Sequence, residues 1–213
     1  MASENLHLEA AARKAALSRL RDDHRALARV VEALETITAA ILEGEREPDF
    51  GLLASMLYYL DAVPERLHHP KEDRYLFAKL RARAPESAAL IERLQREHQR
   101  SPQLIAEMER HLVQWQGGAR DGADAFALAV ARYAEFTWNH MRTEEAEVLP
   151  AAERCLHDAD WVALAEAFRM PDDPLFVMPL GSEFDRLYQR IASLAPRRLR
   201  LSLLRPSART PEA

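Results

Sequence analysis

Residues 66–77 read RLHHPKEDRYLF, and this stretch places a proline inside a segment whose apolar pattern is otherwise helical. Pro70 follows two histidines and precedes two acidic residues, and Pro64 lies about one turn before His68. A proline in a helix interior removes a backbone hydrogen bond and clashes with the preceding turn, which costs about 3 kcal/mol. Such local violations are typical of functional positions, so we expect this segment to contribute to a site.

The composition is that of a compact globular protein. The 213 residues are 48% hydrophobic and 30% charged with only 6 glycines, which is typical of one or two domains. The formal net charge of -5 disfavours nucleic-acid binding through a basic surface. A single cysteine, Cys155, excludes an internal disulfide, and neither an apolar signal segment nor a membrane span is predicted. We therefore expect a cytoplasmic protein without nucleic-acid or membrane partners.

Apolar residues recur at intervals of three and four along most of the chain, whereas the alternation typical of strands is nearly absent. This periodicity predicts four long helices, at about residues 8–43, 50–82, 86–116 and 120–156. Glycine-rich and proline-containing segments separate them. Long helices with short connections favour an all-α fold, an up-down-up-down four-helix bundle.

Two shorter helices are predicted further on, at DADWVALAEAFR and GSEFDRLYQRIASLA. They are too short to form a second core, so we expect them to pack on the bundle. This divides the chain into a bundle at residues 1–157, the short helices at 158–196 and a basic, flexible tail at 197–213. The C-terminal segment is also the candidate surface for a homodimer or a protein partner.

Histidine and glutamate recur at helical spacing within the predicted bundle. Residues four apart share a helical face, so His68 with Glu72 and His140 with Glu144 can each direct an imidazole and a carboxylate to one site. Burying such groups unpaired costs a few kcal/mol each, and a metal removes that cost. The candidate set takes one histidine from each helix: His24, His68, Glu72, His98, His140 and Glu144.

Four imidazoles and two carboxylates suit two ions that the carboxylates bridge. Each ion would then keep positions open to water, dioxygen or another small ligand. Imidazole and carboxylate donors without thiolate favour iron or manganese, with zinc as a possible substitute. A ferritin-like site is disfavoured because it needs two Glu-x-x-His motifs, and only Glu65 to His68 fits.

The order His, His-x-x-x-Glu, His, His-x-x-x-Glu resembles the hemerythrin-like family of HHE cation-binding domains over about residues 15–156. The short sequence motifs around these residues are similar too: DDHRAL, HHPKEDRYLF, REH and NHMRTEEAEVLP. DADW, DPLF and EFDRLYQRI resemble the C-terminal part of bacterial single-domain members. The resemblance implies a bundle with a non-haem diiron centre, in which the six residues of the candidate set are ligands and Glu72 and Glu144 are bridges.

The third helix departs from the pattern of oxygen-carrying hemerythrins, which place two ligand histidines four apart there. The position four after His98 is Pro102, and the poorer ligand set argues against oxygen storage. His69 or Tyr133 could restore a fifth ligand. Neighbouring residues on an ideal helix are turned by about 100°, so His69 is expected at the rim of the site or behind the ligands. Tyr133 lies two turns before His140 on the same face.

The remaining histidines and the acids beside the bridges have simpler interpretations. His7, His111 and His157 are expected at the surface. Asp73 and Glu145 are expected to form exterior salt bridges or contacts behind the ligands. No glycine-rich phosphate loop and no nucleophile constellation around the cysteine is present.

The same ligand set is compatible with three kinds of function. The first hypothesis is a diiron protein that senses or scavenges dioxygen, peroxide or nitric oxide. One alternative is an enzyme that reduces peroxide or repairs iron centres, and another is a helical interaction module with a structural metal.

Pro64, Pro70 and Pro102 fall within about a turn of the candidate ligands, where a kink or widened turn can redirect His68 and Glu72.

Overall fold

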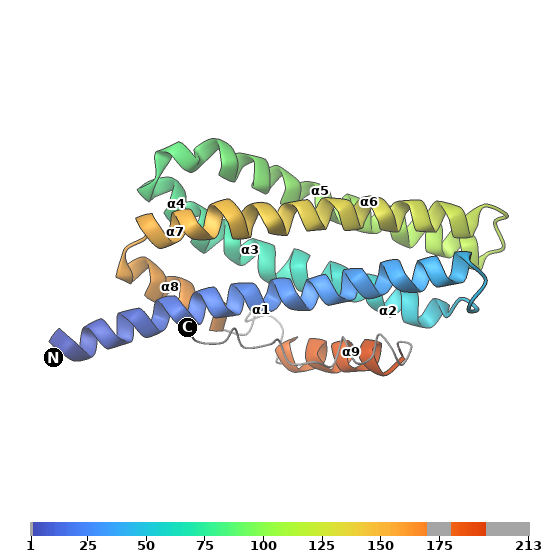
Figure 1. Ribbon diagram of the computed structural model, residues 1–213, viewed down its shortest axis with the longest axis horizontal. Helices are drawn as coiled ribbons and strands as arrows, with labels where there is room; N and C mark the ends of the chain where they lie inside the picture. Colours follow the sequence, from blue (N-terminus) through green and yellow to red (C-terminus); the bar gives the residue numbers. More distant parts are fainter. Residues whose placement is uncertain (1, 170–179, 195–213) are drawn as a thin grey trace.

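The computed structural model describes residues 2–169 and 180–194, and all regular structure within these residues is helical. The expected all-α fold is thereby confirmed for this part of the chain. The long helical segments lie side by side (Figure 1). The segments are α1 (Ala2–Leu42); α2 (Phe50–Leu60) continuing through η1 (Asp61–His68), α3 (His69–Lys71), η2 (Glu72–Phe77) and α4 (Ala78–Arg83); α5 (Ala88–Gln116), after the short turn η3 (Pro85–Ser87); and α6 (Gly122–Thr143) continuing through η4 (Glu144–Val148) and α7 (Leu149–Cys155).

Capping residues and glycines set the turns between these segments. The turn between α1 and α2 and the turn between α5 and α6 lie at one end of the bundle, and the turn between α4 and α5 lies at the other (Figure 1). Asp49 begins α2 because its carboxylate accepts a hydrogen bond of 2.9 Å from the Leu52 N–H. Gly44 after α1 and Gly118 after α5 have φ of 72° and 89°, a region that favours glycine.

Three wide π-helical turns interrupt the second and fourth segments. In such a turn the N–H bonds to the carbonyl five residues earlier, as the N–H of His69 does to the carbonyl of Pro64. The segment η1 ends at His68, η2 begins at Glu72 and η4 begins at Glu144, so each wide turn adjoins a candidate ligand. π-helical turns are frequent at functional sites.

The three prolines near the candidate ligands do not behave alike. The widened turn expected from the sequence is present at Pro64, which lies inside η1, and Pro70 lies in the single turn α3 that joins η1 to η2. No widened turn is present at Pro102, which lies inside the α-helix α5. Proline thus coincides with a changed register in the second segment and not in the third.

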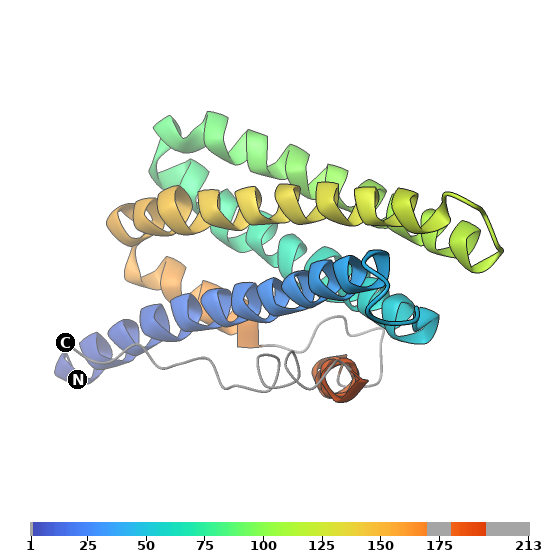
Figure 2. The same ribbon diagram turned by 45° about the vertical axis from the view of Figure 1, so that its right-hand side comes forward.

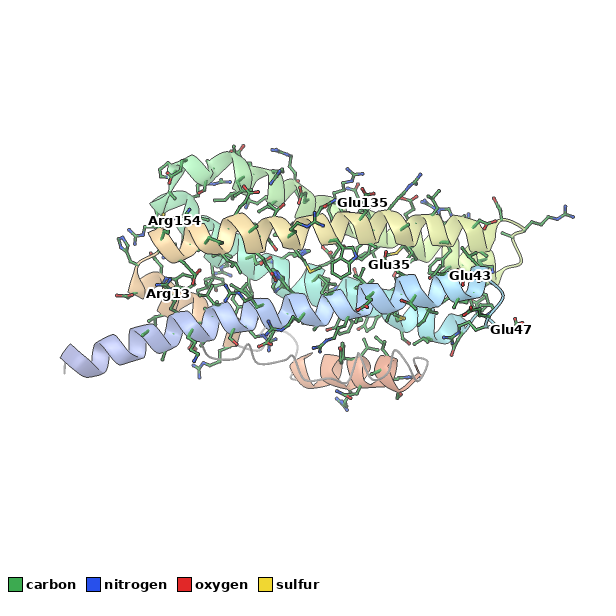
Figure 3. All side chains as sticks on the ribbon, in the orientation of Figure 1. Arg13, Glu35, Glu43, Glu47, Glu135 and Arg154 are labelled. Carbon is green, nitrogen blue, oxygen red and sulfur yellow. The ribbon has the colours of Figure 1, made fainter. Side chains whose placement is uncertain are left out.

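The buried apolar side chains form two clusters, and the candidate site lies between them. Along α1, Leu20 belongs to one cluster and Leu27 to the other, with His24 in between. Along α5, Leu94 and Ile105 flank His98 in the same way. Figure 3 shows side chains filling the space between the long segments, and Glu35 of α1 accepts a hydrogen bond of 3.2 Å from the Trp138 indole of α6.

The structure contains both short helices, α8 (Asp158–Arg169) and α9 (Leu180–Leu194). The helix α8 packs on α1, with Trp161 1% exposed, and its Asp160 carboxylate accepts a hydrogen bond of 2.9 Å from Arg83 of α4. The helix α9 lies outside the four long segments, against α2 (Figure 2), where the rings of Tyr188 and Tyr59 are 5.7 Å apart. The basic tail expected at 197–213 lies outside the described residues. None of the helices in the described part is long and apolar enough to cross a membrane.

Candidate metal centre

The six residues of the candidate set meet at one level of the bundle. They come from all four long segments, and each is between 1% and 6% exposed. Burial of this many ionisable side chains at one place is costly unless they satisfy one another or share a cation. Their mutual geometry therefore decides what the site can hold.

Glu144 of η4 is the first of two carboxylates at the centre of the group. Its Oε2 atom lies 3.2 Å from the Nε2 atom of His24, and its Oε1 atom lies 3.3 Å from the Nε2 atom of His140. The Nε2 atom of His98 is 3.7 Å from the same Oε1 atom. One carboxylate thus faces imidazoles from three helices.

Glu72 of η2 is the second central carboxylate. Its Oε1 atom lies 3.1 Å from the Nε2 atom of His68 and 3.8 Å from that of His24. Its Oε2 atom lies 3.6 Å from the Nε2 atom of His98. All four imidazoles of the candidate set therefore direct Nε2 towards the two carboxylates.

Several of these central atoms have no hydrogen-bond partner of acceptable geometry although they are fully buried. They are the Nε2 atoms of His24 and His68, the Oε2 atom of Glu72 and both carboxylate oxygens of Glu144. Buried polar atoms almost always have hydrogen-bond partners. A group of buried nitrogen and oxygen atoms without partners, all of types that bind metals, therefore indicates a place for a cation. The residues present fit a metal centre on this observation.

The opposite ring nitrogens are all occupied by carboxylates. Each Nδ1 atom faces an acid from another long segment, and such contacts fix the ring orientation of metal-binding histidines. The four contacts are His24 with Glu145 at 3.1 Å, His68 with Asp23 at 3.3 Å, His98 with Asp73 at 3.2 Å and His140 with Glu97 at 2.8 Å.

These outer acids follow one rule. Each is the chain neighbour of a candidate ligand, as Asp23 is of His24, and contacts the histidine of the next long segment in chain order. The fourth segment returns to the first through Glu145 and His24, so the contacts close a ring around the centre. Asp73 and Glu145 thus lie behind the ligands, as expected. The contacts of Asp23 and Glu97 were not predicted. The sequence signal for each contact is only an acidic residue next to a histidine, which does not name the partner.

His69 does not lie at the rim. It is 7% exposed, and its ring stacks on that of His98 with centroids 4.1 Å apart and an interplanar angle of 12°. One ligand atom each from His69, Glu72, His98 and His140 lie within 4.8 Å of one another. The expectation of a rim position is wrong because the wide turn of η1 replaces the ideal helix that it assumed.

Tyr133, the other candidate for a fifth ligand, is buried beside the centre. Its hydroxyl hydrogen bonds to Thr137 and Ser101. Burial, followed by the charge of Glu65, raises the pKa of Tyr133 above its ordinary value, so the phenol keeps its proton. The contacts of the hydroxyl are thus with residues around Glu65.

His111 and His157 are not part of the candidate metal-binding groups. His157 is exposed, and His111 contacts Gln114 at 3.2 Å near the surface. The side chain of His7 lies outside the described part.

The central carboxylates hold protons on the imidazoles when no metal is bound. Burial by itself lowers the pKa of His68, but the charge of Glu72 and a hydrogen bond with Asp23 outweigh burial and raise this pKa to about 9. Burial likewise opposes protonation of His98 and His140, and neighbouring carboxylates raise their pKa values to about 9 and about 10. The carboxylates thus favour the protonated form of these imidazoles in the absence of metal.

The carboxylates show the reciprocal effect. Burial raises the pKa of Glu144, but His140 and the other imidazoles outweigh it and hold this pKa well below the usual range. The pKa of Glu72 is lowered as well, because its imidazole neighbours outweigh both burial and the charge of Glu144. His69 differs from the other four, since burial lowers its pKa despite the nearby Glu65.

The family model described as hemerythrin HHE cation binding domain matches residues 15–152. This range contains all six residues of the candidate set. A comparison with curated proteins finds no match.

Proposed function

Because the chain belongs to the hemerythrin HHE cation-binding family, we propose that it binds two metal ions, iron in the native protein, and senses or handles dioxygen, peroxide or nitric oxide. In this proposal the long segments form an up-down-up-down bundle around the ions. Glu72 and Glu144 would hold both ions, and His24, His68, His98 and His140 would complete the ligand set.

One observation carries the proposal: four Nε2 atoms converge on two buried carboxylates, and the Oε2 atom of Glu72 and both oxygens of Glu144 lack hydrogen-bond partners. Two like charges buried together repel each other, and cations between them remove both the repulsion and the unsatisfied polar atoms. In the described part of the chain, the buried acids and imidazoles that could do this gather at this level.

The donor types favour iron or manganese. Imidazole nitrogen and carboxylate oxygen without thiolate suit these ions, and zinc can replace them because its affinity is higher. Cys155 is not part of the candidate groups. Bound iron supplies redox chemistry and open coordination positions for a small ligand.

The protein residues select what can reach the centre and hold its protons. Each of the six candidate ligands is at most 6% exposed, which favours a diatomic molecule or peroxide over a large substrate. The outer carboxylates hold the Nδ1 protons, so that the Nε2 lone pairs face inward. The same acids can accept the protons that the imidazoles release when metal binds.

Metal analysis of protein produced in iron-rich medium, together with an absorption spectrum before and after addition of peroxide or nitric oxide, tests this function. We expect two iron ions per chain and a spectrum that changes with the added molecule. His111→Ala should retain both ions, and His140→Ala should lose iron. A spectroscopically silent zinc centre that resists both small molecules would contradict the function and assign a structural metal. Steady-state consumption of either molecule would assign an enzyme rather than a sensor.

A further inference from the structure

His69 shares the geometry of the four histidines of the candidate set, although an ideal helix would turn it away from His68 by about 100°. Its Nδ1 atom lies 3.2 Å from the Oε2 atom of Glu65, as each of the other Nδ1 atoms faces a carboxylate. Its ring stacks on His98 and meets the ring of His140 edge-on at 5.5 Å. The imidazole therefore lies among the candidate ligands of one ion.

A buried polar arrangement holds His69 in this position. The side chain of Glu65 is only 6% exposed, and its second oxygen accepts a hydrogen bond of 2.5 Å from the Ser101 hydroxyl of α5. Ser101 is itself 2% exposed. A buried carboxylate fixed between an imidazole and a hydroxyl orients the ring, as carboxylates behind metal-bound histidines do.

The wide turn explains why two consecutive histidines can both face inward. The His69 N–H bonds to the carbonyl of Pro64 instead of that of Glu65, so the backbone takes one more residue per turn there. The next turn begins at Glu72, whose N–H bonds to the carbonyl of His69. His68 and His69 thereby contact opposite halves of the centre, His68 beside His24 and His69 beside His98.

We infer that His69 is a fifth imidazole ligand, of the ion held by Glu72, His98 and His140, and that Glu65 positions it. The inference rests on the two-metal centre proposed above. It makes the ions unequal, with three imidazoles on one and with His24 and His68 on the other. The second segment thus supplies the imidazole that Pro102 prevents the third segment from supplying.

Titration of the metal-free full chain with Co²⁺ alone tests this assignment. Affinities are measured by competition with a chelator, and paramagnetically shifted imidazole N–H signals in the proton NMR spectrum count the bound rings. We expect His69→Ala to bind one ion as the parent does, to bind the other at least about tenfold more weakly, and to lose one shifted signal. Glu65→Gln should retain the shifted signal of His69 and lower the affinity for the same ion by about tenfold.

Two further variants separate a ligand from a packing role. His69→Phe keeps an aromatic ring against His98 but has no ligand nitrogen, so it should show the same loss as His69→Ala. His111→Ala should match the parent. Full binding of both ions by His69→Ala or by His69→Phe would overturn the inference while leaving the two-metal centre intact. Failure of the parent itself to bind two ions would instead overturn the proposed function.

Discussion

The Nδ1 atom of His140 lies 2.8 Å from the Oε2 atom of Glu97, the residue that directly precedes His98 on α5. The orientation of a candidate ligand on α6 thus depends on a side chain of α5. A proton held on Nδ1 leaves the Nε2 lone pair facing Glu144, which is the form of imidazole that binds a metal.

Glu97→Gln should weaken metal binding while leaving the fold intact. The amide can still contact His140 but no longer carries the charge that stabilises the ring and its proton. We expect the affinity for metal to fall by about 10–100-fold, measured by chelator competition. Glu92→Gln, on an exposed part of the same helix, is the matched control. Equal affinities in both variants would show that the ring of outer acids does not act on the ligands.

The metal-free protein should lose stability as the pH rises from 6.5 to about 10. The pKa values of His68, His98 and His140 are raised from 6.5 to between about 9 and about 10, so their contribution is complete below 6.5 and lost as the pH passes the raised values. The lowered pKa values of Glu72 and Glu144 stabilise the folded protein above pH 4.5, and this stabilisation is lost in acid.

Urea unfolding at several pH values checks this dependence. The free energy of unfolding of the metal-free protein should be greatest between pH 4.5 and 6.5, the ordinary pKa values of the two kinds of group. The metal-loaded protein should lose less stability towards pH 10, because ions replace the protons. Parallel curves for the two forms would contradict the assignment of these residues to the metal.

Metal binding near neutral pH should release protons. His68 and His140 carry protons there because their pKa values are about 9 and about 10, and an imidazole must lose its proton to bind a metal. Calorimetric titration with Mn²⁺ in two buffers of different ionisation enthalpy measures the release. The observed heat should differ between the buffers, and the affinity should rise with pH. Identical heats would mean that no protonated imidazole becomes a ligand.

Pro64→Ala tests whether the wide turn serves the site. Alanine restores an N–H donor, so a regular α-helical turn can form in place of η1 and rotate His68 away from Glu72. We expect the metal-free protein to become more stable, by at most about 3 kcal/mol, and the metal affinity to fall. Pro102→Ala is the control, because α5 has no π-helical turn there. An unchanged affinity in Pro64→Ala would separate the proline from the function.

The sequence predicted the helices and the convergence of the candidate set because both follow from regular spacing. His24 and His98 lie on apolar stripes, and His140 and Glu144 are one turn apart, so the four-segment pattern was sufficient to bring them together. The contacts of the outer acids were harder to predict, since Asp23 contacts a histidine 45 residues away on another segment. An acid beside a histidine says nothing about which neighbouring helix it will contact.

His69 was misplaced for a different physical reason. Its predicted orientation came from an ideal helix, whereas η1 makes its hydrogen bonds over five residues. The prolines signalled an irregular turn at residues 64 and 70, yet the same signal at residue 102 corresponds to a regular helix. A proline alone therefore does not predict where a π-helical turn forms.

Anomalous diffraction at the iron edge from crystals of the iron-loaded protein locates the bound ions and counts them. We expect two anomalous peaks per chain, both in contact with Glu72 and Glu144. His24 and His68 should contact one peak, and His98 and His140 the other. A single peak, or a peak away from the two carboxylates, would contradict the two-metal centre.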